Sequence, residues 1–178
     1  MQPALHPSPV RTLHTIGHST RPADLFTGLL RAHGIATLAD VRTVPRSRHN
    51  PQFDREALAA SLAALGLGYV HLPALGGLRR PRADSVNLGL RSAGLRGYAD
   101  HMQTDEFRRG LERLEALAVA GATAIMCAEA EPSRCHRALL SDALLARGWR
   151  VLHIRGDGAV EHAPSPAMRT VDDRPVYP

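Results

Sequence analysis

The chain has 178 residues and a formal net charge of +5, and arginine fills all 22 of its lysine or arginine positions. A chain of this length can bury a substantial core as one domain. Two cysteines are too few for a disulfide framework, no apolar run approaches the roughly 20 residues of a membrane span, and no secretory leader opens the chain. We therefore expect a cytoplasmic protein with no membrane partner.

The positive charge is concentrated toward the N-terminus. Residues 1–53 hold six arginines against only Asp24 and Asp40, a balance of +4, whereas the rest of the chain is nearly neutral. Arginine binds phosphate and carboxylate groups through a planar fork. This distribution favours an anionic partner, with a nucleotide or a nucleic acid (DNA or RNA) as the obvious candidates. A solvated basic loop is the alternative.

Predicted strands and helices alternate along the chain. Residues 1–10, which include three prolines, have the composition of a flexible leader. Short apolar runs predict strands at residues 13–16, 37–41, 69–72, 123–127 and 150–154. Helical spacing of apolar residues follows Pro22 and Asp54, resumes near Arg96 and Thr104, and runs from Ser133 to Arg147. The segment 78–95 is too long for a simple connection, and residues 157–178 form a C-terminal tail with no assigned structure.

This alternation predicts the fold. Strands separated by helices are typical of a mostly parallel sheet that is covered on both faces. We expect an α/β fold, with residues 11–156 forming a single three-layer, Rossmann-like domain around a sheet of about five strands.

Residues 127–137 are the densest group of reactive side chains. They hold both cysteines, two glutamates, a histidine and two arginines, between a predicted strand and a predicted helix. Open α/β sheets bind ligands at this kind of crossing. We interpret the segment as a functional loop. An ordinary turn, with a Ser133 helix cap and buried cysteines, is the alternative.

Several polar residues are expected to meet at one edge of the sheet, because parallel strands present their carboxyl ends together. We assign catalytic roles to Asp40, Glu129, His18 and His136. We assign substrate-binding roles to Ser19, Arg42, Arg46, Gly76, Gly77, Cys127 and Arg137. A structural ion pair is the alternative for Asp40 with Arg42, and a tight turn is the alternative for the two glycines.

The same residues carry a resemblance to a known family. The matching runs are Thr15–Ser19, Asp40–Arg42 with Pro45 and Ser47 behind it, Leu75–Gly77, Cys127–Glu129 with Pro132, and Cys135–Arg137. In order and spacing they resemble the bacterial and archaeal family called domain of unknown function 488, over about residues 12–155. The resemblance implies a compact α/β domain whose motifs belong together, and the family name records that no general activity is assigned.

The chemistry that we expect at this edge is hydrolysis of an N-glycosidic bond in a nucleotide or a nucleic acid, which would include a role in DNA repair. Breaking that bond creates an oxocarbenium-like sugar, which the carboxylate of Asp40 or Glu129 could stabilise while His18 or His136 moves protons. Arg42, Arg46 and Arg137 would then hold phosphate. No cofactor is expected.

Other chemistries stay open. A non-catalytic nucleic-acid binding protein is the main alternative, and the same residues suit phosphoester hydrolysis or ligand sensing. A metal-dependent hydrolase could use Cys127, Cys135 and His136, with His18 as a fourth ligand, although their spacing is unlike a compact zinc knuckle and no metal is assigned. The expected position of Cys135 in the first turn of a helix would favour a thiolate, and with it a redox or nucleophilic role.

Overall fold

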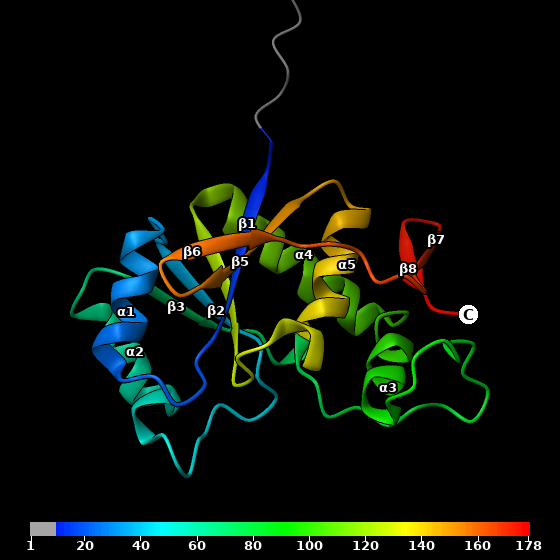
Figure 1. The fold of residues 1–178 in the computed structure, drawn as a ribbon, viewed down its shortest axis with the longest axis horizontal. Helices are drawn as coiled ribbons and strands as arrows, with labels where there is room; N and C mark the ends of the chain where they lie inside the picture. The colour runs from blue at the N-terminus through cyan, green and yellow to red at the C-terminus, as the bar shows by residue number, and fades with distance from the viewer. Residues whose placement is uncertain (1–9) are drawn as a thin grey trace, which may run out of the picture.

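The computed structural model describes residues 10–178 and contains a six-stranded sheet and a separate two-stranded hairpin (Figure 1). The expected leader falls, except for residue 10, on residues 1–9, which lie outside the described residues. The strands of the large sheet are β1 (Thr12–Gly17), β2 (Thr37–Asp40), β3 (Gly68–His71), β4 (Thr123–Cys127), β5 (Arg150–Arg155) and β6 (Gly158–Glu161). The helices are α1 (Ala23–Ala32), α2 (Arg55–Ala63), α3 (Ala93–His101), α4 (Asp105–Ala120) and α5 (Arg137–Ala146).

The large sheet has the order β3-β2-β4-β1-β5-β6, and its first five strands are parallel. Only β6 pairs antiparallel, with β5. Helices α1 and α2 cover one face, whereas α3, α4 and α5 lie on the other (Figure 1). The predicted fold is therefore confirmed: a mostly parallel, Rossmann-like α/β sheet lies between two helical layers.

Local sequence explains the central elements. All five residues of β4 are buried, as expected for a parallel strand covered on both faces. Thr104 caps α4 by accepting a hydrogen bond from the backbone N–H of Phe107. Phe107, Leu111 and Leu114 then recur at helical spacing and are all buried. Helix α4 therefore docks on the sheet through one apolar face.

The segment before α5 departs from the expected helix. Residues Pro132–Arg134 form a single 3-10 turn, closed by a hydrogen bond from the Cys135 N–H to the Pro132 carbonyl oxygen. Cys135 then adopts an extended backbone, with φ −133° and ψ 154°, and the α-helix begins at Arg137 instead of Ser133. The tight turn uses the residues that were expected to start the helix. Cys135 thus lies just before the helix and not within its first turn.

The C-terminal residues are held in place by contacts that no pattern in their sequence predicts. Besides β6, they form the hairpin of β7 (Arg169–Val171) and β8 (Arg174–Val176). Tyr177 is fully buried, and its backbone N–H donates to the Asn87 side-chain oxygen. In turn, Asp100 of α3 accepts hydrogen bonds from Arg82, Ser85 and Asn87. The long segment between β3 and α3 is therefore fastened to both α3 and the tail.

No helix among residues 10–178 is long and apolar enough to cross a membrane.

Candidate functional site

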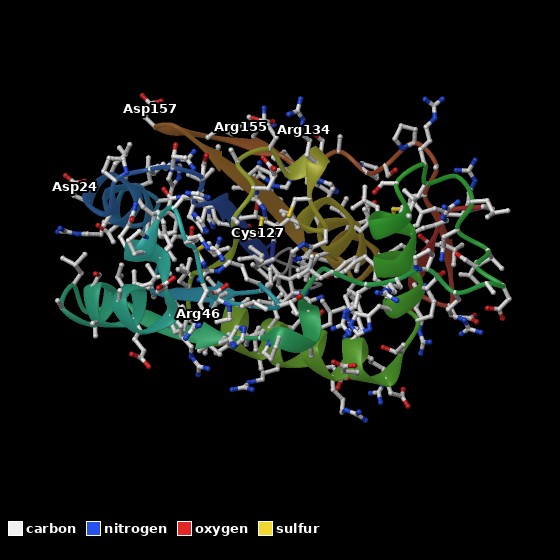
Figure 2. The ribbon with its side chains drawn as sticks, turned by 90° about the horizontal axis from the view of Figure 1, so that it is seen from below. Asp24, Arg46, Cys127, Arg134, Arg155 and Asp157 are labelled. Atoms are coloured by element: carbon white, nitrogen blue, oxygen red, sulfur yellow. The ribbon has the colours of Figure 1, made fainter. Side chains whose placement is uncertain are left out.

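The sheet reverses its winding between β1 and β4, which are hydrogen-bonded neighbours. The chain leaves β1 toward the β3 edge, past the end of β4, and leaves β4 toward the β6 edge, past the end of β1, so the two connections lead to helices on opposite faces of the sheet. Ligands bind at such reversal points in open α/β sheets. Figure 2 shows this side of the molecule, with Cys127 near its middle and Arg46 and Arg134 on opposite sides of it.

Backbone fills the gap at the reversal point. The amides of His18 and Ser19 donate to the carbonyl oxygens of Cys127 and Ala128, each at 2.9 Å. The chains approach so closely that a Cβ atom added to Gly17 would lie 1.9 Å from the Glu129 carbonyl oxygen. The polar residues of this edge therefore fall into two separate groups, one on each side of this backbone contact.

The first group is sealed, and we call Asp40, Arg42, Tyr69 and His18 the closed cluster. Asp40 is fully buried, and its two carboxylate oxygens accept hydrogen bonds from Nε and Nη2 of Arg42, at 2.9 and 2.6 Å, and from the Tyr69 hydroxyl, at 2.6 Å. Arg42 also donates to the carbonyl oxygen of Phe53. Burial disfavours the Arg42 cation, but the bonds to Asp40 outweigh it and raise the pKa of Arg42. The polar atoms of this ion pair therefore bind each other, Tyr69 and Phe53, and not a ligand.

His18 completes the closed cluster as a neutral ring. Its Nδ1 lies 2.8 Å from the Ser19 carbonyl oxygen, so Nδ1 carries the hydrogen, and its Nε2 faces a guanidinium nitrogen of Arg42 at 3.4 Å. The ring stacks on Phe53 with 4.3 Å between centroids. Burial lowers the pKa of His18, which keeps the ring uncharged at neutral pH.

The second group faces a cleft of about 490 Å³. One wall is the start of α3, with Ser92 and Tyr98, and the other is the loop after β4, with Glu129. Gly77 and Arg134 lie on its rim, and Cys135 and His136 also line it. We call this the open cleft. Of the eleven residues assigned from sequence, Gly77, Glu129 and His136 line it, whereas Asp40 and His18 do not.

Cys135 has a second thiol and a histidine ring as close neighbours in the open cleft. Its Sγ lies 2.9 Å from Sγ of Cys127 and 3.4 Å from Nδ1 of His136, and both cysteines are free thiols. The contact between the two sulfurs lowers the pKa of Cys135, against the effect of burial and with help from His136. The same contact, together with burial, raises the pKa of Cys127. Between the two cysteines, the surroundings therefore favour the thiolate on Cys135.

His136 is placed to share a proton with Cys135. Its Nε2 lies 3.3 Å from the Val41 carbonyl oxygen, which can only accept, so Nε2 carries a hydrogen. The other nitrogen, Nδ1, faces the Cys135 sulfur at 3.4 Å. A Cβ atom on Gly77 would lie 2.9 Å from this Nδ1, so a larger residue there would displace the ring. Gly77 thus makes room for a cysteine–histidine couple.

Arg137 supports the cysteines from within the protein. Its side chain is 1% exposed, and its Nη2 donates to the carbonyl oxygens of Glu129 and Ala130, at 2.6 and 3.2 Å. Its Nη1 donates to the Thr15 hydroxyl, and within residues 10–178 it forms no ion pair with a carboxylate. This buried positive charge acts to lower the pKa of Cys127, against the stronger effects that raise it, and the backbone N–H of Arg137 helps to lower the pKa of Cys135.

The other assigned residues lie elsewhere on this edge. A Cβ atom on Gly76 would meet Thr43, so this glycine admits a neighbouring side chain. Arg46 is exposed and lines a different depression, together with Asp54 and Glu56. Ser19 is partly exposed and has a positive φ of 48°.

No group of three or more histidine, cysteine, aspartate or glutamate side chains within residues 10–178 is arranged to hold a metal ion. Two thiolates on one tetrahedral zinc, with Zn–S bonds of about 2.3 Å, would lie about 3.8 Å apart. The cysteine sulfurs, at 2.9 Å, are closer than such a site requires.

The family described as "Domain of unknown function DUF488" matches residues 22–144, which include β2, β3 and β4, the residues that line the open cleft, and the closed cluster except His18. The chain belongs to the DUF488 family. No curated protein and no solved structure matches it. Membership in DUF488 joins the motifs in one domain and assigns no reaction to them.

Sequence reasoning missed several parts of the DUF488 site. Tyr69 binds Asp40 from the neighbouring strand, and Tyr98 forms a wall of the open cleft, but neither belongs to a motif. Cys135 is not among the eleven residues assigned from sequence, although its expected place at the start of a helix favours a redox or nucleophilic thiol.

Proposed function

We propose that this protein is an enzyme that uses Cys135 as a covalent nucleophile, with His136 as its proton partner, on a substrate bound in the open cleft. One observation carries the proposal. The Cys135 sulfur lines the cleft while three features favour its thiolate: the Cys127 thiol at 2.9 Å, the His136 ring at 3.4 Å, and the start of α5 two residues later.

The proposed substrate is an anionic compound such as a nucleotide. Arg134 on the cleft rim and the overall charge of +5 support this class. The start of α3, at Ser92, also faces the cleft and adds a positive helix end. A thiolate attack would form a bond from Cys135 to the electrophilic atom of the substrate, and His136 would protonate the leaving group.

The test measures the reactivity of Cys135 directly. The rate of alkylation by iodoacetamide, with the modified residue located by mass spectrometry, is expected to be nearly constant from pH 5 to pH 8. An ordinary thiol, with a pKa of about 8.5, would react roughly tenfold faster for each pH unit in this range. His136→Gln should restore part of that pH dependence. Ordinary behaviour in the wild-type protein would defeat the proposal.

A matched search then looks for the substrate. The wild-type protein is mixed with nucleotides and short DNA or RNA oligomers, quenched in acid and weighed intact. The expected product is a covalent adduct that maps to Cys135 and is absent in Cys135→Ser.

Hydrolysis of an N-glycosidic bond is a second candidate, favoured by one observation. Glu129 is exposed in the same cleft as His136, so a carboxylate and a proton donor can face one substrate. In this version Asp40 has a structural role, since both of its oxygens are occupied.

The second candidate is tested by release of free base from nucleosides and from modified DNA. Glu129→Gln should abolish release without unfolding the protein. Glu131→Gln is the matched control, because Glu131 is also exposed but pairs with Arg155. Release that survives Glu129→Gln would exclude this candidate.

A further inference from the structure

We propose that Cys127 and Cys135 form a redox pair that reduces a disulfide substrate in the open cleft, with Cys135 attacking the substrate and Cys127 resolving the mixed disulfide. This inference rests on the proposed role of Cys135 as the nucleophile. To that role it adds Cys127 as a second reacting thiol, a disulfide as the class of substrate, and an oxidised form of the protein that contains a Cys127–Cys135 disulfide.

The two sulfurs are close enough to bond after a small movement. Their separation of 2.9 Å must shrink by about 0.9 Å to reach a disulfide bond length of about 2.05 Å. Cys127 ends β4, whereas Cys135 lies in extended backbone between a 3-10 turn and α5. The Cys135 backbone is therefore outside any regular element and can supply the movement.

Burial fixes the order of the two thiols. Cys135 is 8% exposed and lines the open cleft, whereas Cys127 is 2% exposed and lies behind it. A disulfide that enters the cleft thus meets Cys135 first. Once a mixed disulfide has formed, the Cys127 sulfur is the nearest protein thiol that can attack it.

The charges around the two cysteines favour a pair that alternates between dithiol and disulfide, and they disfavour a permanent disulfide. Arg137 is buried without a carboxylate partner within residues 10–178, and its Nη2 grips the carbonyl oxygens of Glu129 and Ala130 in the loop between the cysteines. The Arg137 cation acts on Cys127, and the backbone N–H of Arg137 at the start of α5 acts on Cys135, so both favour a thiolate, which exists only in the reduced pair. Stabilising the reduced form lets an external dithiol reduce the Cys127–Cys135 disulfide again, and it requires that the substrate disulfide be the more oxidising of the two.

The electrons and protons balance in two steps. The Cys135 thiolate attacks one sulfur of the substrate disulfide, whose S–S bond breaks, and the departing thiolate takes from His136 the proton that Cys135 had given to it. The Cys127 thiol then loses its proton to His136 or to water and attacks the Cys135 sulfur. The mixed disulfide breaks, and the second substrate thiolate leaves and is protonated. The substrate has gained two electrons, and the protein holds a Cys127–Cys135 disulfide, which an external dithiol reduces.

The experiment uses glutathione disulfide as the probe and intact mass as the readout. Wild-type protein should lose two hydrogen atoms and keep no glutathione, and dithiothreitol should reverse the change. Cys127→Ser and Cys127→Ala should each stop at a glutathione adduct on Cys135 that lasts at least about tenfold longer than in the wild type. Cys135→Ser should remain unmodified at the same probe concentration. Far-ultraviolet circular dichroism checks that each variant is folded.

Two results would overturn the inference: a wild-type protein that retains its glutathione adduct, or one that does not react with the disulfide. The iodoacetamide profile of the wild type separates this failure from failure of the proposed function. A flat profile without an internal disulfide removes only the redox pair, whereas an ordinary profile removes the nucleophile itself.

Discussion

The closed cluster and the open cleft lie on the same edge of one sheet, yet their polar atoms are used in opposite ways. In the closed cluster the Asp40 carboxylate is 0% exposed, and Arg42 and Tyr69 satisfy its oxygens. In the open cleft, the surroundings of Cys135 lower the pKa of its thiol, and the residue faces space that a ligand can enter. The closed cluster and the open cleft thus share a position at the edge of a parallel sheet. They differ in whether their polar groups can still bind a ligand.

The two groups are also joined. His136 of the open cleft contacts the carbonyl oxygen of Val41, which lies between Asp40 and Arg42 in the chain. The amide of His18 donates to the carbonyl oxygen of Cys127. The ion pair of the closed cluster therefore holds rigid the backbone against which the cysteine–histidine couple is set.

The largest expected effect is structural and falls on the closed cluster. Asp40→Asn leaves the Arg42 guanidinium buried without its counter-charge, so the free energy of unfolding in urea should fall by about 3–5 kcal/mol. Glu131→Gln breaks an exposed ion pair with Arg155 and should cost less than about 1 kcal/mol. If Asp40→Asn kept its full stability and lost a measured activity instead, Asp40 would be catalytic and the contrast would disappear.

Arg137→Met tests the support of the open cleft, with a smaller expected cost. Losing the bonds to two carbonyl oxygens and to Thr15 should lower the free energy of unfolding by about 2 kcal/mol. It should also slow alkylation of Cys135 at pH 6, because the cation that acts on Cys127 no longer offsets negative charge on the hydrogen-bonded cysteine pair. Arg137→Lys keeps the charge and should recover part of the rate, whereas the exposed Arg134→Ala should alter stability by less than about 0.5 kcal/mol. Unchanged alkylation in Arg137→Met would contradict the assigned role.

The sequence predicts the sheet and the residues at its strand ends, but it does not predict which polar group is sealed and which is open. Alternating apolar runs place Asp40 and Cys127 at the ends of parallel strands, and the structure confirms the sheet. Which group is sealed depends on Tyr69 in the adjacent strand and on the carbonyl oxygen of Phe53, which is eleven residues beyond Arg42. No local pattern reports such tertiary partners.

The sequence does not predict the contact between Cys127 and Cys135, nor the structure of the C-terminal tail. The physical reasons for the two failures differ. The cysteines approach because a 3-10 turn replaces the expected first turn of the helix, and helical periodicity does not resolve one turn of this kind. Every residue of β6 and β7 is exposed, so these strands lack the apolar alternation by which strands are recognised.

The next effect is a pH dependence that arises behind the open cleft. His153 accepts a hydrogen bond from Thr15, which also binds Arg137, and its other ring nitrogen lies 2.9 Å from His162. Burial, together with His162 and nearby arginines, lowers the pKa of His153 to about 4. Its unfolded pKa is about 6.5, so between these values the unfolded chain binds more protons than the folded one. Stability should therefore fall as the pH falls from 6.5 toward 4.

Urea midpoints at intervals across this range check the expected sign. Other buried histidines with a lowered pKa, such as His14 and His101, act in the same direction, so the wild-type slope belongs to all of them. His153→Asn should flatten the slope without removing it. A slope that the substitution leaves unchanged would mean that His153 is not neutral in the folded protein.

The smallest expected effect is on the salt dependence of nucleic-acid binding. It shows whether the proposed nucleic-acid partner lies along the loop after the closed cluster or enters the open cleft. Arg46 and Arg48 are exposed on the loop that follows the closed cluster, whereas Arg134 is exposed at the open cleft. Each phosphate contact contributes about 0.9 to the slope of log affinity against log salt concentration on duplex DNA. If both loop arginines bind phosphate, Arg46→Ala with Arg48→Ala should reduce the slope by about 1.8, and Arg134→Ala should reduce it only if the strand also enters the cleft.

Protection of Cys135 decides between these two paths. An oligonucleotide that occupies the open cleft must slow alkylation of Cys135 by iodoacetamide, because the sulfur is reached only from that side. An oligonucleotide that lies along the loop alone lowers the salt slope through Arg46 and Arg48 and leaves the alkylation rate unchanged. Binding without protection would make the open cleft a site for a smaller molecule, and an absence of binding at low salt would remove nucleic acid as a partner of either group.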